Sequence, residues 1–192
     1  MDRFEFYFSF YGLLLGLSVA EVAGGCANAV GARKLIRLGW LTPLLAIFVL
    51  LDISSFWIQA WRVRHQAAIT YPAIFIGLAV ALAYYLAAAL VFPRQLSEWS
   101  DLDEHYTAHK KHVLGGVLFA NLVVTGIAIA YRPEIIGQLG SAQDLLYFSP
   151  LIALFFTRRK LIDAALLAAL IIFYIAGAAT GWFETGVSPT SA

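Results

Sequence analysis

Two carboxylic acids, Glu21 and Asp52, lie within long apolar stretches and are the residues best placed to do chemistry. At a helical rise of about 1.5 Å per residue, they would lie roughly 15 and 18 Å from the same membrane surface. A charged carboxylate at the centre of a bilayer costs about 2.5–3.5 kcal/mol, and no lysine or arginine is placed at this depth to neutralise either group. Both are therefore expected to be neutral, to share a proton or to hold a cation. Each of these states suits a proton or cation pathway.

Polar residues accompany both carboxylic acids at helical spacing, which predicts a polar layer through the middle of a helix bundle. Spacings of three and four residues bring side chains onto one stripe of a helix. The expected ion-binding set consists of Ser18 and Asn28 with Glu21, Ser55 and Gln59 with Asp52, and Tyr84, Tyr85 and Asn121 from later stretches. The alternative is that both carboxyl groups are protonated and only hydrogen-bond neighbouring helices together.

A second pattern, this one of histidines, suggests metal chemistry. His105, His109 and His112 recur at spacings of four and three, and Asp101 precedes the first of them by four residues. On a helix these positions fall within an arc of roughly 80°, and histidines one turn apart can share a metal. The pattern predicts a divalent-metal site only if a second helix completes it, and two adjacent lysines disfavour a cation. The alternatives are a solvated helix that faces anionic lipid headgroups, or a pH sensor.

The composition requires a membrane around these residues. Of 192 residues, 61% are hydrophobic and 13% are charged, against about 25% charged in an average soluble domain. The apolar residues come in long runs, which indicates that lipid is the solvent. The net charge of +1 gives no electrostatic reason to expect nucleic acid as a partner. The sequence therefore predicts an all-α integral membrane protein with the lipid bilayer as its immediate surroundings.

The elements that position the polar residues are about six transmembrane helices in a single domain over residues 1–192. A span needs about 20 mostly apolar residues. The stretches that qualify are 6–31, 41–61, 72–92, 113–131, 142–157 and 161–183. The fifth is the weakest, because it is short and carries Pro150. The fourth helix is expected to begin near Asp101, so that it extends into the cytoplasm before it enters the bilayer.

The distribution of basic residues predicts the orientation. Connections after the odd-numbered stretches hold nine basic residues and the opposite side holds four. By the positive-inside rule, both termini are expected on the non-cytoplasmic side. Short connections and small-residue-rich stretches suit a bacterial inner membrane. The basic residues of the first group are Arg33, Lys34, Arg37, Arg94, Lys110, Lys111, Arg158, Arg159 and Lys160, and those of the second are Arg3, Arg62, Arg64 and Arg132.

Three classes of function follow from these patterns. The first is a small proton or cation channel or carrier that uses the intramembrane carboxyl groups. The second is an accessory or assembly subunit of a larger membrane complex. The third is a membrane-embedded metal enzyme that uses the histidines, and the sequence favours a non-enzymatic role over it. Small residues recur every four positions at Gly12, Gly16, Ala20 and Gly24, and could pack within one chain or in a homo-oligomer.

Overall fold

The computed structural model describes residues 3–62, 70–131 and 140–181, and these ranges fold into helices without a β-strand. The predicted all-α fold class is therefore confirmed. In chain order the elements are α1 (Arg3–Gly31), α2 (Leu41–Arg62), α3 (Tyr71–Ala89), the short 3-10 helix η1 (Leu96–Glu98), α4 (Leu102–Tyr131), α5 (Ala142–Phe156) and α6 (Lys160–Ala179).

Five of these helices have the length and hydropathy that a membrane span requires, namely α1, α2, α3, α4 and α6. The chain is thus an integral membrane protein of the helical class. α5 follows the predicted fifth stretch closely, but its 15 residues are fewer than the 20 or so of a full span. α6 ends at Ala179, earlier than predicted, and Gly181 there adopts a positive φ of 66°, a conformation that favours glycine.

α4 begins where the sequence predicts, and a capping box explains why. Asp101 Oδ1 accepts a hydrogen bond of 2.7 Å from the backbone N–H of Glu104, and Glu104 Oε2 accepts one of 2.5 Å from the hydroxyl of Ser100. The first contact satisfies a backbone donor that the first turn of a helix leaves unpaired, and the second ties Glu104 to the residue before the cap. The 30 residues of α4 span about 45 Å, which is longer than the roughly 30 Å of bilayer hydrocarbon.

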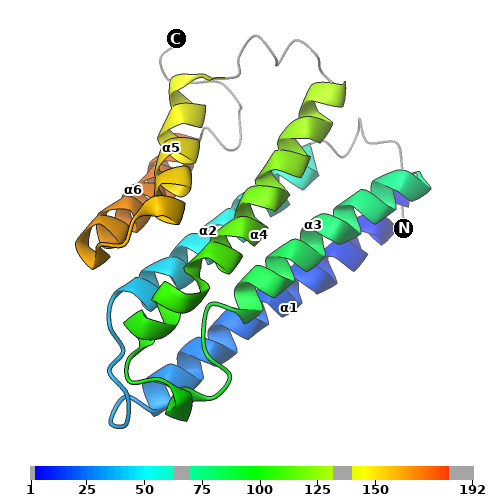
Figure 1. Cartoon of the computed structure of the whole chain (residues 1–192). Coiled ribbons are helices and arrows are strands. Elements are labelled where there is room, and N and C mark those ends of the chain that lie inside the picture. Colours follow the sequence, from blue (N-terminus) through cyan, green and yellow to red (C-terminus); the bar gives the residue numbers. More distant parts are fainter. Residues whose placement is uncertain (1–2, 63–69, 132–139, 182–192) are drawn as a thin grey trace.

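The connections α1–α2, α3–α4 and α5–α6 gather at one end of the bundle, at the lower left in Figure 1. Thr42 Oγ1 donates to the Leu102 carbonyl at 2.7 Å, and this contact fastens the start of α2 to the start of α4. Lys160 Nζ lies 3.6 Å from Asp103 Oδ2 and brings the start of α6 to the same place. All nine basic residues of the first group belong to this end, which is called the basic end below.

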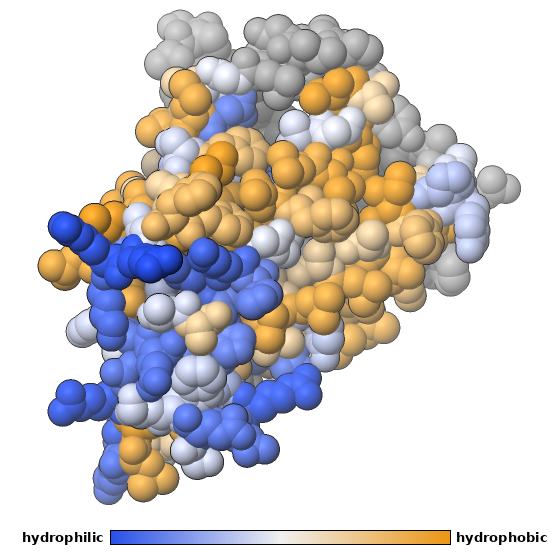
Figure 2. Space-filling model, in the orientation of Figure 1, coloured by the Kyte–Doolittle hydropathy of each residue, from blue (hydrophilic) through white to orange (hydrophobic). Residues whose placement is uncertain are grey.

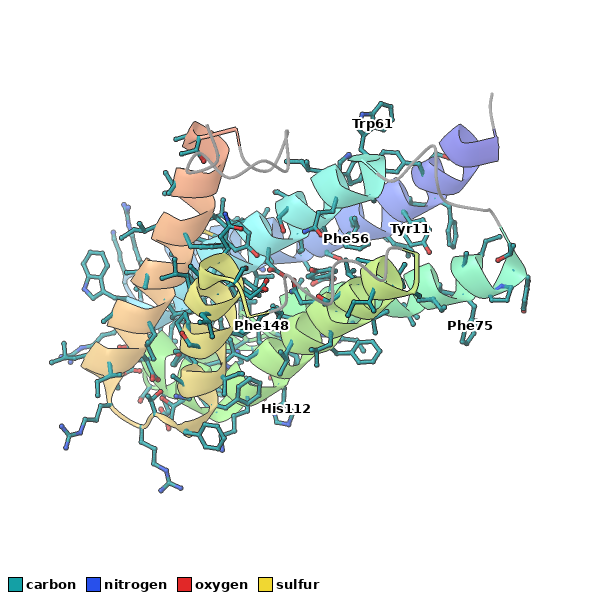
Figure 3. All side chains as sticks on the ribbon, turned by 90° about the horizontal axis from the view of Figure 1, so that it is seen from above. Tyr11, Phe56, Trp61, Phe75, His112 and Phe148 are labelled. Carbon is teal, nitrogen blue, oxygen red and sulfur yellow. The ribbon has the colours of Figure 1, made fainter. Side chains whose placement is uncertain are left out.

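The surface divides into two regions. Hydrophilic residues gather at the basic end, and hydrophobic residues cover the sides of the helices (Figure 2). α1 and α3 run side by side, α3 packs on α4, and α6 packs on α2 and α5. Tyr11 lies between α1 and α3, where its hydroxyl donates to the Ile74 carbonyl at 3.1 Å (Figure 3).

The repeated small residues of α1 serve different purposes. A Cβ built on Gly12 would lie 2.6 Å from the ring of Trp57, so this glycine allows α1 and α2 to approach closely. Gly16 and Gly24 have open space where a Cβ would point. Packing within the chain therefore uses Gly12 and leaves Gly16 and Gly24 on an uncovered face of α1.

Candidate functional site

Asp52, midway along α2, is the centre of the most polar cluster inside the bundle. Its side chain is completely buried. α2 places it there because Phe48, Val49 and Ile53, its neighbours along the helix, are buried in the hydrophobic core as well. A carboxyl group that enters such a core needs hydrogen-bond partners from other helices, since unpaired burial of a charge is very unfavourable.

Four side chains from four different helices donate hydrogen bonds to the Asp52 carboxyl. Tyr84 of α3 donates to Oδ2 at 2.8 Å. Asn121 Nδ2 of α4 lies 3.1 Å from Oδ2 and 3.3 Å from Oδ1. Tyr147 of α5 donates to Oδ1 at 2.6 Å, and Tyr174 of α6 donates to the same oxygen. We call Asp52 and these four residues the Asp52 cluster.

The chemistry of the Asp52 cluster matches an ionised carboxylate. A carboxylate only accepts hydrogen bonds, and both of its oxygens here receive donors. Within the described part of the chain, the two ion pairs, Lys110–Asp163 and Lys160–Asp103, both lie at the basic end. An ionised Asp52 would therefore have only oriented hydroxyl and amide dipoles to balance its charge in this part of the chain, and the same groups can rearrange around a protonated acid.

Glu21 lies in different surroundings from Asp52. Its side chain is exposed on the outer face of α1, and its Oε1 accepts a hydrogen bond of 3.2 Å from the hydroxyl of Tyr85. Tyr84 and Tyr85 are neighbours on α3, so the two carboxyl groups lie at a similar level, as their sequence depths predict. Asp52 faces the core and Glu21 faces outward, and each carboxyl group has its own hydrogen-bond partners.

The remaining residues of the predicted polar layer also divide into buried and more exposed side chains. Ser55 is buried beside the Asp52 cluster, where its hydroxyl donates to the backbone carbonyl of Asp52 at 2.8 Å. Ser18 is also buried, but its hydroxyl donates to the Leu14 carbonyl of its own helix at 3.1 Å. Asn28 is exposed on α1, and Gln59 is half-buried on α2. The structure thus joins Tyr84, Asn121 and Ser55 to Asp52 and places the other residues elsewhere.

Sequence reasoning missed Tyr147 and Tyr174. Both are buried at Asp52, and both lie within the predicted fifth and sixth stretches. The signal that could have found them is a tyrosine inside an apolar stretch rather than at its end. Tyrosine prefers the membrane interface, where its hydroxyl meets water, so a tyrosine at depth needs a polar partner inside the protein.

The predicted metal site is not assembled. His105 is buried and its Nε2 contacts the Leu90 carbonyl at 3.1 Å. The rings of His105 and His109 stack with centroids 4.2 Å apart, and His112 points away from the bundle (Figure 3). Asp101 caps α4. In the described ranges no three His, Cys, Asp or Glu side chains are grouped so that they could hold a metal ion.

The physical reason for this arrangement is the side-chain geometry along one straight helix. Helical spacing aligns the three histidines on one stripe, but it also separates Asp101 and His112 by three turns. Trp99 packs against both His105 and His109, with ring centroids 4.9 and 5.5 Å away. The Trp99 ring therefore covers part of the His105 and His109 side chains that ligands from a second helix would have to approach.

A buried ion pair at the basic end was not predicted. Lys110 Nζ of α4 lies 2.6 Å from Asp163 Oδ2 of α6 and donates to the Thr157 carbonyl at 2.7 Å. The Thr157 hydroxyl donates to the other oxygen of Asp163. Both charged side chains are almost fully buried, at 4% and 5% exposure. The pair fastens the α5–α6 connection to the first turns of α4.

Comparison with protein families, with curated proteins and with solved structures finds no match to this chain.

Proposed function

We propose that this chain is a small membrane carrier of protons, or of a solute coupled to protons, in which Asp52 takes up and releases the proton. The observation that carries the proposal is the Asp52 cluster itself, a carboxyl group completely buried midway along α2 and held by four donors. Ionisable residues inside a membrane commonly mark proton or ion pathways.

The choice of a carboxyl group supports proton chemistry over a purely structural link. An asparagine or serine at position 52 could hydrogen-bond neighbouring helices without the cost of burying a charge. Aspartic acid offers two states with opposite hydrogen-bonding character. The ionised form only accepts, whereas the protonated form has one O–H group that donates. A site that uses both states can exchange a proton.

The arrangement of the donors supports coupling between the proton and helix packing. Tyr84 and Asn121 approach Asp52 from α3 and α4, while Tyr147 and Tyr174 approach from α5 and α6. Protonation removes one acceptor position, so at least one hydroxyl must rotate or move away. Proton uptake therefore changes at least one of the contacts by which Asp52 joins α2 to α3, α4, α5 and α6, which is what a proton-coupled transition requires.

The membrane orientation that accompanies this proposal places the basic end in the cytoplasm, through the positive-inside rule. With α5 crossing alongside the five longer helices, both termini then lie on the opposite side, and short connections suit a bacterial inner membrane. Reporter fusions to the C-terminus test this placement. A cytoplasmic reporter signal from the C-terminal fusion would contradict it.

The function is tested by proton flux into liposomes that contain the purified protein. Wild type is compared with Asp52→Asn, and Glu21→Gln serves as the matched control because it neutralises the exposed carboxyl group at a similar depth. We expect flux in wild type and in Glu21→Gln, and none above empty liposomes in Asp52→Asn. Equal flux in Asp52→Asn and wild type would contradict the assignment of Asp52, and absence of flux in wild type across pH gradients and added solutes would contradict transport.

A second candidate function, as a subunit of a larger membrane complex, rests on the outer face of α1. Glu21 and Asn28 are exposed there at membrane depth, and Gly16 and Gly24 leave open space beside them. A helix of a partner protein with a hydrogen-bond donor would satisfy Glu21 and pack against the glycines. Gly24→Leu should fold normally and should release such a partner in native membranes. An unchanged complex size in this variant would remove the candidate.

A further inference from the structure

A pocket of about 440 Å³ lies at the basic end, separate from the Asp52 cluster. Its walls come from the protruding turns of α4, the end of α5, the α5–α6 connection and the start of α6. The buried pair Lys110–Asp163 contributes to its lining. The pocket is therefore built around a buried and hydrogen-bonded ion pair.

The pocket carries an excess of positive charge. Four cationic side chains line it, Lys110, Lys111, Arg158 and Lys160, against one carboxylate, Asp163. Lys110 is neutralised by Asp163 at 2.6 Å, and Lys160 lies 3.6 Å from a carboxylate outside the pocket. Lys111 and Arg158 are exposed and form no ion pair with any residue that the structure describes. Two cations are thus available to an anionic ligand.

The backbone adds to this positive potential. α6 begins at Lys160, and its N-cap residue, Arg159, makes no side-chain hydrogen bond to the first turn. The N–H groups at the start of a helix carry partial positive charge and favour a phosphate or another anion nearby. Asp163 reduces this potential but is already paired with Lys110. The start of α6 therefore favours an anionic ligand, as the lysine and arginine side chains do.

An apolar wall adjoins these charges. Phe156, the last residue of α5, lines the pocket and is 80% exposed. Leu161, in the first turn of α6, is 86% exposed. Hydrophobic helix surface gives way to a hydrophilic region toward the basic end, as Figure 2 shows. A membrane protein has this change of polarity where lipid tails meet lipid headgroups.

We propose that this pocket binds the phosphate headgroup of an anionic phospholipid, with Lys111 and Arg158 on the phosphate and an acyl chain along Phe156 and Leu161. Free phosphate shares the charge chemistry, but it gives no role to Phe156, an exposed apolar side chain of the pocket lining, or to exposed Leu161, which follows Lys160 in sequence. Basic pockets between membrane helices on the cytoplasmic side are suited to such headgroups. This site is independent of the proton chemistry at Asp52.

The test measures phosphatidylglycerol bound to the purified full chain in detergent by native mass spectrometry, with thermal unfolding as a second readout. Phosphatidylcholine and inorganic phosphate are titrated separately. The pocket variant is Lys111→Gln with Arg158→Gln. The matched control is Lys34→Gln with Arg33→Gln, which removes one lysine and one arginine that are exposed at the same end but outside the pocket.

We expect phosphatidylglycerol to bind and to raise the unfolding temperature, and phosphatidylcholine and inorganic phosphate to do neither. The pocket variant should weaken binding roughly tenfold or more, because each basic side chain near a membrane surface strengthens it by about fivefold. The control variant and Arg158→Lys should bind nearly as wild type does. Equal loss in the pocket and control variants would overturn the site in favour of diffuse surface charge. Equal binding of the two lipids, or competition by inorganic phosphate, would also overturn it.

Discussion

Tyr84 on α3 donates a 2.8 Å hydrogen bond to Asp52 on α2, in a part of the bundle where both side chains are almost fully buried. The next residue along the chain, Tyr85, donates to Glu21 at the outer surface. One helix thus contacts a carboxyl group on each of two sides, and only the inner one is enclosed by other helices. This difference directs the proton hypothesis to Asp52.

The donors of the Asp52 cluster should stabilise the fold as well as hold the carboxyl group. Tyr147→Phe removes one hydroxyl from a buried carboxylate, and we expect it to lower the free energy of unfolding by about 1–2 kcal/mol. Tyr85→Phe removes the hydroxyl that pairs with exposed Glu21 and should lower it by less than half as much. Unfolding in detergent measures both. Equal effects of the two substitutions would contradict the enclosure of Asp52 by its donors.

The buried pair Lys110–Asp163 should be costly to break on one side only. Lys110→Met leaves the Asp163 carboxylate buried without its cation, and we expect a loss of about 3–5 kcal/mol in unfolding free energy. The double variant Lys110→Met with Asp163→Leu removes both charges and should recover most of this loss. Thermal or denaturant unfolding of the four proteins of the cycle gives the coupling energy. Additive losses from the two single substitutions would show that the pair is not coupled.

The role of Asp101 as a helix cap makes a prediction that a metal ligand does not share. Asp101→Ala should lower the stability of the fold by about 0.5–2 kcal/mol, because the N–H of Glu104 loses its acceptor. Asp101→Asn retains a capping oxygen and should remain close to wild type. Unfolding is measured with a chelator present, so that any metal is removed. A loss that disappears in the chelator would instead support metal ligation.

Much of the fold could be predicted from the sequence, because apolar stretches of about 20 residues have few other solutions. The start of α4 was predictable as well, from an N-cap residue followed three positions later by an acidic side chain. The face that each helix turns toward its neighbours could not be predicted from the sequence. In lipid, both the packed and the exposed faces of a helix are apolar, so hydrophobic periodicity does not separate them.

Because hydrophobicity does not separate packed from exposed helix faces, the sequence could not show which of the predicted site residues lie together. Glu21 and Asp52 have similar depths and similar neighbours in sequence, yet α1 exposes the first and α2 buries the second. Tyr147 and Tyr174 reach Asp52 from helices that are distant in sequence, and only the three-dimensional packing brings them together. The histidines show the regular spacing of one helix, but in the described ranges no second helix brings a His, Cys, Asp or Glu side chain to them.

Proton exchange at Asp52 is tested most directly by infrared spectroscopy of the purified protein during a pH titration. This measurement detects the carbonyl band of a protonated carboxylic acid. Proton exchange at Asp52 predicts a band that appears as the pH falls, that is retained in Glu21→Gln and that is missing in Asp52→Asn. A spectrum in which Asp52→Asn changes no pH-dependent carbonyl band would contradict proton exchange at Asp52. The Asp52 cluster would then be a structural link between helices.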